Sequence, residues 1–185
     1  MALLGPDGAG KSTLAAGLCE CLPLDTRVYY LGAFRAMPPQ WRLRRLPGLA
    51  FASRLAAIWH SVMAGYRHRA RGGVAVFDRY TYDGLLPTTG RRARIKSALI
   101  ARAAPAPDLV ILLDAAPELM FARKREHSPD VLATYRRSYL ALAQRLPHMV
   151  IVDAGQAAED VLAAAACAVQ ARWVDRYGAW PAIHV

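Results

Sequence analysis

The sequence predicts a three-layer α/β fold, with a parallel sheet of about five strands and helices on both of its faces. Short aliphatic runs alternate along the chain with longer segments of helical period, and these runs lack the strict apolar–polar alternation of a half-exposed sheet. The chain has 185 residues, of which 55% are hydrophobic and 21% are charged, as in a globular domain with a sizeable core. We therefore expect residues 1–185 to form a single domain.

Five runs have the composition of buried strands, being short and rich in aliphatic and β-branched residues. Two of them, "GGVAVFDRY" and "DLVILLD", run into charged residues at their carboxyl ends. The expected strands are 1–4, 27–31, 72–80, 108–114 and 148–154.

Helices are expected between these strands, because apolar residues there recur at helical spacing. A connection that contains Pro38, Pro39 and Pro47 separates the second strand from a long helix. The expected helices cover about 10–22, 52–66, a segment from 117, 128–146 and 161–169.

Two prolines mark helix starts in the second half of the chain. Pro117 and Pro129 suit the first turn of a helix, where the missing amide is not needed. Ser128, directly before Pro129, is expected to cap the free amides with its hydroxyl.

The formal net charge is +10, from 24 basic and 14 acidic residues, which favours anionic partners such as nucleotides or phosphorylated metabolites. Two basic tracts, "RLRR" at 42–45 and "RRARIK" at 91–96, lack interleaved aromatic residues. We interpret them as solvated surface, so nucleic acid is not an expected partner.

No apolar run approaches the roughly 20 residues that a bilayer span needs. The most apolar segment is interrupted by Arg54 and His60, and no export signal precedes the first strand. Three cysteines without paired spacing argue against a disulfide framework. We expect a cytoplasmic protein, and a homodimer is one assembly that the sequence leaves open.

The segment "GPDGAGKSTL" matches the phosphate-loop pattern G-x-x-x-x-G-K-[ST], directly after the first strand and before a helix. Glycines let successive amides curl around phosphate oxygens, and the helix dipole favours the same anion. This context predicts a P-loop NTPase fold that binds ATP. The expected nucleotide-binding residues of the loop are Gly5, Pro6, Asp7, Gly8, Ala9, Gly10, Lys11, Ser12 and Thr13.

Within the loop, Lys11 is expected to reach the β- and γ-phosphates, and the Ser12 hydroxyl is expected to ligate Mg²⁺. The pattern does not account for Asp7, since a carboxylate beside a triphosphate is repelled unless it contacts another group. Asp7 either orients the group that is phosphorylated or makes a hydrogen bond that stabilises the loop.

Asp78, Arg79 and Tyr80 follow the third strand, and ligands of open α/β sheets bind beyond the carboxyl ends of the strands. Asp78 is expected to hold Mg²⁺ through water, and Arg79 to grip a phosphate or carboxylate of the acceptor. The alternative is a structural ion pair at the end of the strand.

Arg123, Lys124 and Arg125 form a basic segment just before the helix start at Ser128. Phosphoryl transfer needs positive charge around the transferred group, and a closing arginine segment can supply it. A solvated basic helix end explains the same residues equally well.

Taken together, these segments resemble the thymidylate kinase family of nucleoside monophosphate kinases, along nearly the whole chain. "GPDGAGKSTL" and "DRY" resemble that family's phosphate loop and the motif after its third strand. "PDLVILLDAAPELMFARKRE" and "YRRSYLALAQRLPHMVIVDAGQAAEDV" are similar to the segment that leads into its lid and to its late helix, strand and adenine-side loop.

The resemblance implies a P-loop kinase domain with a five-stranded parallel sheet, which uses ATP and Mg²⁺ to phosphorylate a nucleotide. It implies that Lys11 binds phosphate, that Ser12 meets Mg²⁺, that Asp7 contacts the acceptor sugar and that Arg79 binds the acceptor phosphate. Tyr80, in the same motif, is expected to lie at the acceptor.

On the donor side, the resemblance places Arg123 against the adenine, with Ala154, Gly155 and Gln156 lining that pocket. It also implies a short lid at about 116–130. Gly8 stands where some family members carry a loop arginine, so Arg125 or a neighbour in the lid is expected to supply that charge.

The acceptor half departs from the family pattern. "LGAFRAMPPQ" replaces an Arg-Glu-Pro-Gly-Gly element after the second strand, and "TYDGLLPTTG" replaces the residues that read thymine. The expected function is transfer of the γ-phosphate of ATP to a nucleoside monophosphate-like acceptor. The alternatives are a kinase for another small metabolite, such as a sugar or glycan precursor, and a non-catalytic module that senses nucleotides or binds polyanions.

Overall fold

The computed structural model of the chain describes residues 1–31, 49–146 and 148–181. Three features discussed above fall wholly or mostly outside these residues. They are the proline-punctuated connection, the basic tract at 42–45 and most of "LGAFRAMPPQ".

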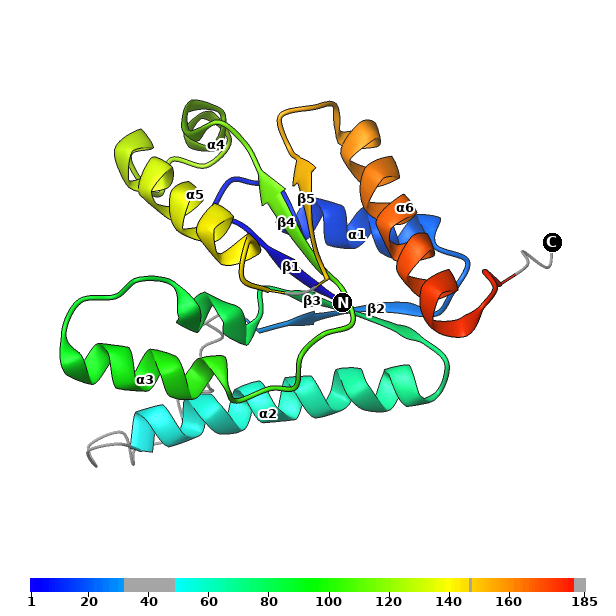
Figure 1. Cartoon of the computed structure of the whole chain (residues 1–185), viewed down its shortest axis with the longest axis horizontal. Coiled ribbons are helices and arrows are strands. Elements are labelled where there is room, and N and C mark those ends of the chain that lie inside the picture. The colour runs from blue at the N-terminus through cyan, green and yellow to red at the C-terminus, as the bar shows by residue number, and fades with distance from the viewer. Residues whose placement is uncertain (32–48, 147, 182–185) are drawn as a thin grey trace.

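The described residues form a five-stranded sheet in which all strands are parallel, in the order β2-β3-β1-β4-β5 (Figure 1). This confirms the predicted fold class. Each expected strand is present, and its observed ends lie within two residues of the predicted ones. The strands are β1 Ala2–Leu4, β2 Thr26–Tyr30, β3 Val74–Asp78, β4 Val110–Asp114 and β5 Met149–Asp153.

Helices cover both faces of the sheet. Leu3 and Ile111 point to the face that packs against the first and last helices, whereas Leu4 and Leu112 point to the opposite face. This alternation gives each face its own buried cluster, as a sheet covered on both sides requires. The helices are α1 Lys11–Cys21, α2 Leu49–Ala70, α3 Arg91–Ala101, α4 Pro117–Arg123, α5 Pro129–Ala143 and α6 Ala158–Tyr177.

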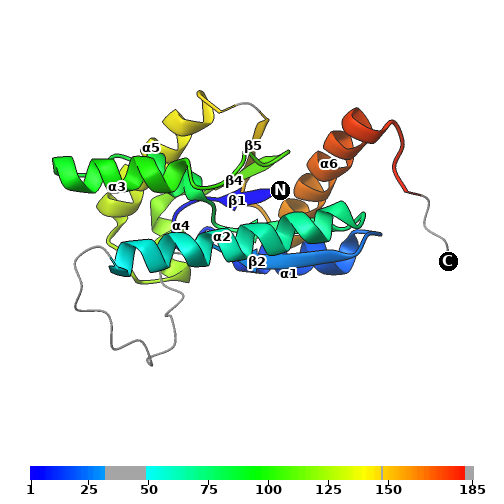
Figure 2. The same ribbon diagram turned by 90° about the horizontal axis from the view of Figure 1, so that it is seen from below.

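The arrangement of the helices is clear in two views. α3 and α6 lie at opposite ends of the molecule, both when it is seen as in Figure 1 and when it is seen from below (Figure 2). α1 packs against α6, and α4 packs against α5. In the part of the chain that the structure describes, no helix is both long and apolar enough to cross a bilayer.

Two local features differ from the sequence-based expectations. Residues 91–96 are mostly exposed, in agreement with their interpretation as basic surface, but they begin a helix that was not expected, α3, which packs on the short 3₁₀ helix η2 (Thr81–Leu85). Ser128 does precede α5, with Pro129 in its first turn, but the Ser128 side chain makes no capping hydrogen bond. That part of the prediction was wrong, whereas Pro129 stands in the first turn of the helix as expected.

The topology places the carboxyl ends of β1, β3 and β4 next to one another. Leu3 in β1 is in register with Asp78 at the end of β3 and with Ile111 in β4. The loop that follows Leu4 therefore emerges beside Asp78. In such sheets this edge is where ligands bind.

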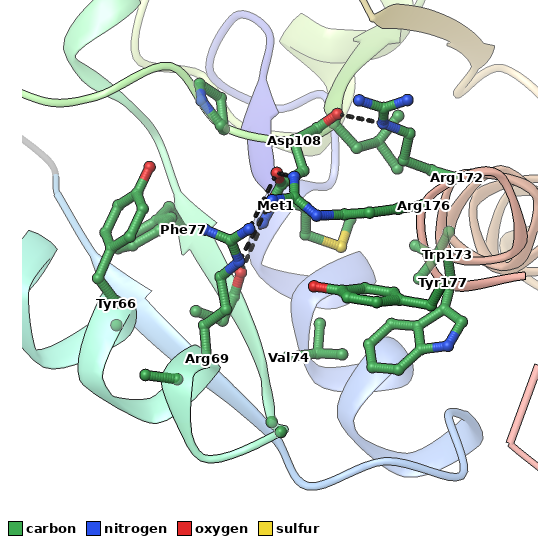
Figure 3. Close-up of a pocket in the computed structure, with 18 residues that line it drawn as sticks. Met1, Tyr66, Arg69, Val74, Phe77, Asp108, Arg172, Trp173, Arg176 and Tyr177 are labelled. Carbon is green, nitrogen blue, oxygen red and sulfur yellow. Dashed lines mark hydrogen bonds and ion pairs between the residues drawn. The ribbon is translucent and has the colours of Figure 1, made fainter.

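A cavity of about 360 Å³ lies at the opposite, amino end of the sheet, between α2 and α6 (Figure 3). Its polar groups are paired: Arg69 and Arg176 contact the Asp108 carboxylate, and the Met1 ammonium donates to the Ala75 carbonyl at 2.7 Å. Burial lowers the pKa of the Met1 amine to about 6. None of the predicted site residues lines this cavity.

Candidate active site

The phosphate loop joins β1 to α1, and two of its glycines are required by the observed geometry. Gly8 has φ +86°, and a Cβ atom there would lie 2.4 Å from the carbonyl oxygen of Met120 in α4. Gly10 has φ +94° and immediately precedes α1, in a conformation that L side chains rarely adopt. The loop is therefore curled tightly and packed against α4.

Lys11, the first residue of α1, lies beneath this loop. Its side chain is only 7% exposed, and its ammonium group donates to the carbonyl oxygens of Gly5 at 2.8 Å and Pro6 at 2.7 Å. Burial, reinforced by the nearby Arg79 guanidinium, lowers the pKa of Lys11 to about 8. The lysine is thus held against the loop, although its burial disfavours the protonated, charged form of the side chain.

Ser12 and Asp78 are brought together from positions far apart in the sequence. The Ser12 hydroxyl donates to a carboxylate oxygen of Asp78 at 2.7 Å, and Asp78 is only 5% exposed. A hydroxyl and a carboxylate oxygen beside a phosphate loop fit the ligand preference of Mg²⁺, which takes few protein oxygens and completes its shell with phosphate and water. The pair matches the two residues that the sequence assigned to the metal.

Arg79 lies between two carboxylates at the same edge of the sheet. Its guanidinium donates to Asp7 of the phosphate loop and, at 3.5 Å, to Asp83 of η2. Burial opposes the charge, but Asp83 and Asp7 raise the pKa of the guanidinium above its ordinary value. Burial would likewise raise the pKa of Asp7, yet Arg79 and Lys11 hold it below its usual value. Both groups are therefore charged at neutral pH.

The backbone of Arg79 explains how its side chain reaches this position. Its φ is +69°, in the left-handed region that few residues other than glycine adopt. Its amide still donates to the Leu3 carbonyl at 3.2 Å, which continues the pairing of β3 with β1. The turn thus redirects the chain immediately after β3 while it stays attached to the sheet.

Asp83 and Tyr139 belong to the site but were not singled out from the sequence. The Tyr139 hydroxyl, on α5, donates to the second carboxylate oxygen of Asp83 at 2.9 Å. Asp83 had a detectable signal, since it follows "DRY" by three residues at the same end of the sheet. Tyr139 had none, because it lies within the expected helix 128–146, where no motif distinguishes it.

Tyr80 lies apart from this group. Its side chain is 2% exposed, its ring packs against Phe77 and Tyr82, and its hydroxyl donates to the carbonyl of Pro105. The structure therefore brings Asp7, Asp78 and Arg79 together but does not bring the Tyr80 side chain to them.

The residues expected around the adenine lie together. Arg123, at the end of α4, donates to the carbonyl of Ala154 at 2.9 Å. Asp153, the last residue of β5, accepts hydrogen bonds from the Gly155 amide and the Gln156 side chain, both at 2.8 Å. These contacts fix the loop after β5 relative to the end of α4.

The basic segment after α4 is exposed. Arg125 has no hydrogen-bond or ion-pair partner among the residues that the structure describes, and Lys124 pairs with Glu126 at 3.0 Å. His127, which the sequence left unassigned, lies 4.0 Å from the Asp7 carboxylate. This segment therefore borders the phosphate loop.

Known proteins resemble this chain in sequence and in fold. A sequence profile of the thymidylate kinase family matches residues 49–165. A thymidylate kinase from Xanthomonas campestris is 32% identical, over 95% of this chain and 85% of that protein. A protein from Archaeoglobus fulgidus with the description "Probable thymidylate kinase" is 28% identical, over 87% of this chain and 89% of its own length.

Among solved structures, thymidylate kinase from Candida albicans matches with a TM-score of 0.63. The match covers 92% of this chain and 90% of that one, at 16% identity. At that identity the likeness concerns the fold, which is the same parallel sheet with helices on both faces.

Proposed function

This chain belongs to the thymidylate kinase family, and we propose that it transfers the γ-phosphate of ATP to a nucleoside monophosphate with the help of Mg²⁺. The observation that carries the proposal is the contact between Ser12 and Asp78 beside the phosphate loop. It joins the metal-binding hydroxyl of the loop pattern to a buried carboxylate on the neighbouring strand. A glycine-rich turn without such a partner would be a weaker indication.

On the donor side, the amides of the curled loop and the amino end of α1 bind the phosphates of ATP. Lys11 moves its ammonium group from the loop carbonyls of Gly5 and Pro6 to phosphate oxygens. Arg123 packs against the adenine, beside the loop of Ala154 to Gln156. Ser12 and Asp78 would hold Mg²⁺, which when bound neutralises charge on the β- and γ-phosphate oxygens.

On the acceptor side, the Arg79 guanidinium binds the acceptor phosphate, and the Asp7 carboxylate contacts a hydroxyl of its sugar. Both groups carry the charge that these roles require, as their pKa shifts indicate. Tyr80 supports this end of β3 from within the core, through its contact with Pro105.

We infer that residues 116–130, which contain α4 and the start of α5, act as the lid of a P-loop kinase domain spanning 1–185. Arg125 is exposed and has no hydrogen-bond or ion-pair partner among the described residues, and it supplies positive charge to the transferred group when the lid closes. Since ATP is supplied inside the cell, we also infer that the enzyme works in the cytoplasm.

A panel of nucleoside monophosphates, including dTMP, tests the proposal by acceptor-dependent release of ADP. We expect turnover with at least one member and none with Lys11→Ala. The panel also identifies the base, because the residues that read thymine in relatives are replaced in this chain. The proposal would be contradicted if only sugar phosphates promoted the release of ADP, or if no acceptor of the panel promoted it.

A further inference from the structure

Asp83 and Tyr139 form a contact beside Arg79 that the proposed function leaves without a role. Asp83 offers one carboxylate oxygen to Arg79 at 3.5 Å and the other to the Tyr139 hydroxyl at 2.9 Å. Tyr139 is 4% exposed and belongs to the buried cluster beneath α5. The carboxylate therefore bridges the guanidinium to the core.

The segment that carries Asp83 is firmly supported. A Cβ atom on the next residue, Gly84, would lie 2.5 Å from the Ser97 carbonyl in α3, so the two backbones are in close contact. The Thr81 hydroxyl donates to the Ala101 carbonyl at 3.4 Å, in the same helix. Asp83 is thus held from two sides, by α3 through its backbone and by α5 through its side chain.

Asp7, the other partner of Arg79, lacks such support. It lies on the phosphate loop, and the only other ionisable side chain within 4.0 Å of its carboxylate, among the described residues, is the His127 imidazole. Arg79 therefore has one anchored partner and one that can exchange. An acceptor phosphate competes with Asp7 for the guanidinium more readily than with Asp83.

We propose that Asp83 and Tyr139 are positioning residues that hold Arg79 for the acceptor phosphate, while Asp7 is the partner that this phosphate displaces. The displaced Asp7 carboxylate is then free to contact the acceptor hydroxyl. Binding of the acceptor phosphate thus prepares the carboxylate for its own role. This inference rests on the proposed function, since it requires a phosphorylated acceptor.

The test separates the two aspartates by steady-state kinetics with the best acceptor of the panel. Asp83→Asn and Tyr139→Phe should each raise the acceptor KM about tenfold and leave the ATP KM within about twofold, because a charge-assisted hydrogen bond that orients Arg79 is lost. The double variant should be no worse than Asp83→Asn alone, because both changes break one chain of contacts. Asp7→Asn should instead lower kcat without raising the acceptor KM.

Tyr66→Phe is the matched control. The Tyr66 hydroxyl donates to the carbonyl of Ala106 at 3.2 Å, and Tyr66 lines the cavity at the amino end of the sheet, so its loss is expected to leave both KM values unchanged. Normal folding of each variant is checked by its unfolding temperature. An unchanged acceptor KM in Asp83→Asn and Tyr139→Phe would overturn this inference alone. Absence of turnover in the wild-type chain with every nucleoside monophosphate would overturn the proposed function and this inference together.

Discussion

Lys11 shows at the scale of one residue how burial changes the chemistry of a charged group. Its pKa is lowered to about 8, because its side chain is buried beneath the phosphate loop near Arg79. Phosphate oxygens favour the protonated form, so ATP binds best when Lys11 carries its proton.

The affinity for ATP should therefore fall as the pH rises above about 8, by up to tenfold per pH unit, because the free chain then loses the Lys11 proton that the complex retains. Calorimetric titration with Mg-ATP between pH 7 and pH 9.5 measures this slope. Lys11→Met binds more weakly and should show no slope above pH 8. A dissociation constant of the wild-type chain that stays flat up to pH 9.5 would contradict the low pKa.

Tyr80 provides a second test at this scale, since its expected contact with the acceptor and its observed position differ. Tyr80→Phe removes the hydroxyl that donates to Pro105 and should destabilise the fold by about 1 kcal/mol, while the acceptor KM stays unchanged. Urea unfolding and steady-state kinetics measure the two effects. A large rise in the acceptor KM with unchanged stability would instead support the role expected from the sequence.

At the scale of an element, the phosphate loop is defined by its close packing on α4 as well as by the amides of its own backbone. Gly8 and Gly10 both have positive φ, but only Gly8 would place a Cβ atom against another element, the carbonyl of Met120. A side chain at either glycine would therefore introduce a similar backbone strain, but only a side chain at Gly8 would also clash with another element.

We expect Gly10→Ala to lower the free energy of unfolding by about 1 kcal/mol, from the left-handed backbone alone. Gly8→Ala should lower it by about 3 kcal/mol, because α4 must also move away from the added methyl group. Denaturant unfolding of the two variants gives the difference directly. Equal losses would show that the loop does not rest on α4 as described.

The elements also show which patterns are readable in a sequence. β1, β3 and β4 are almost fully buried, so their aliphatic composition predicts them well. α3 was missed because charged residues dominate its first half and, of its large apolar residues, only Ile100 is buried, whereas Ile95 and Leu99 are 53% and 52% exposed. A helix that packs through few side chains leaves little periodicity to detect.

At the scale of the whole molecule, ligand binding at the sheet edge should stabilise the entire fold, since the loop joins the central strand β1 to α1. At 100 times its dissociation constant, Mg-ATP should add about 2.7 kcal/mol to the free energy of unfolding and raise the unfolding temperature by roughly 5–10 °C. Differential scanning fluorimetry with Mg-ATP, and with ATP plus a chelator, measures the part that depends on magnesium.

Asp78→Asn should lose most of the magnesium-dependent part and keep the part that ATP provides alone, because only the carboxylate paired with Ser12 is changed. Its kcat should also fall far more than its affinity for ATP. A variant that retains both the magnesium effect and its turnover would show that the metal binds elsewhere.

The sequence by itself determined the parallel sheet and the phosphate loop, because both depend on neighbouring residues: buried runs of aliphatic side chains and one glycine-rich segment before a helix. Only the tertiary structure decided which side chains meet beyond the carboxyl ends of the strands. Arg79 meets Asp7 across 72 residues and Tyr139 meets Asp83 across 56, and no local pattern encodes either pairing. The physical reason is that the direction of a side chain depends on the backbone and on packing: the positive φ of Arg79 and the packing of α5 decide where these side chains point. The same arrangement leaves the Tyr80 side chain in the core.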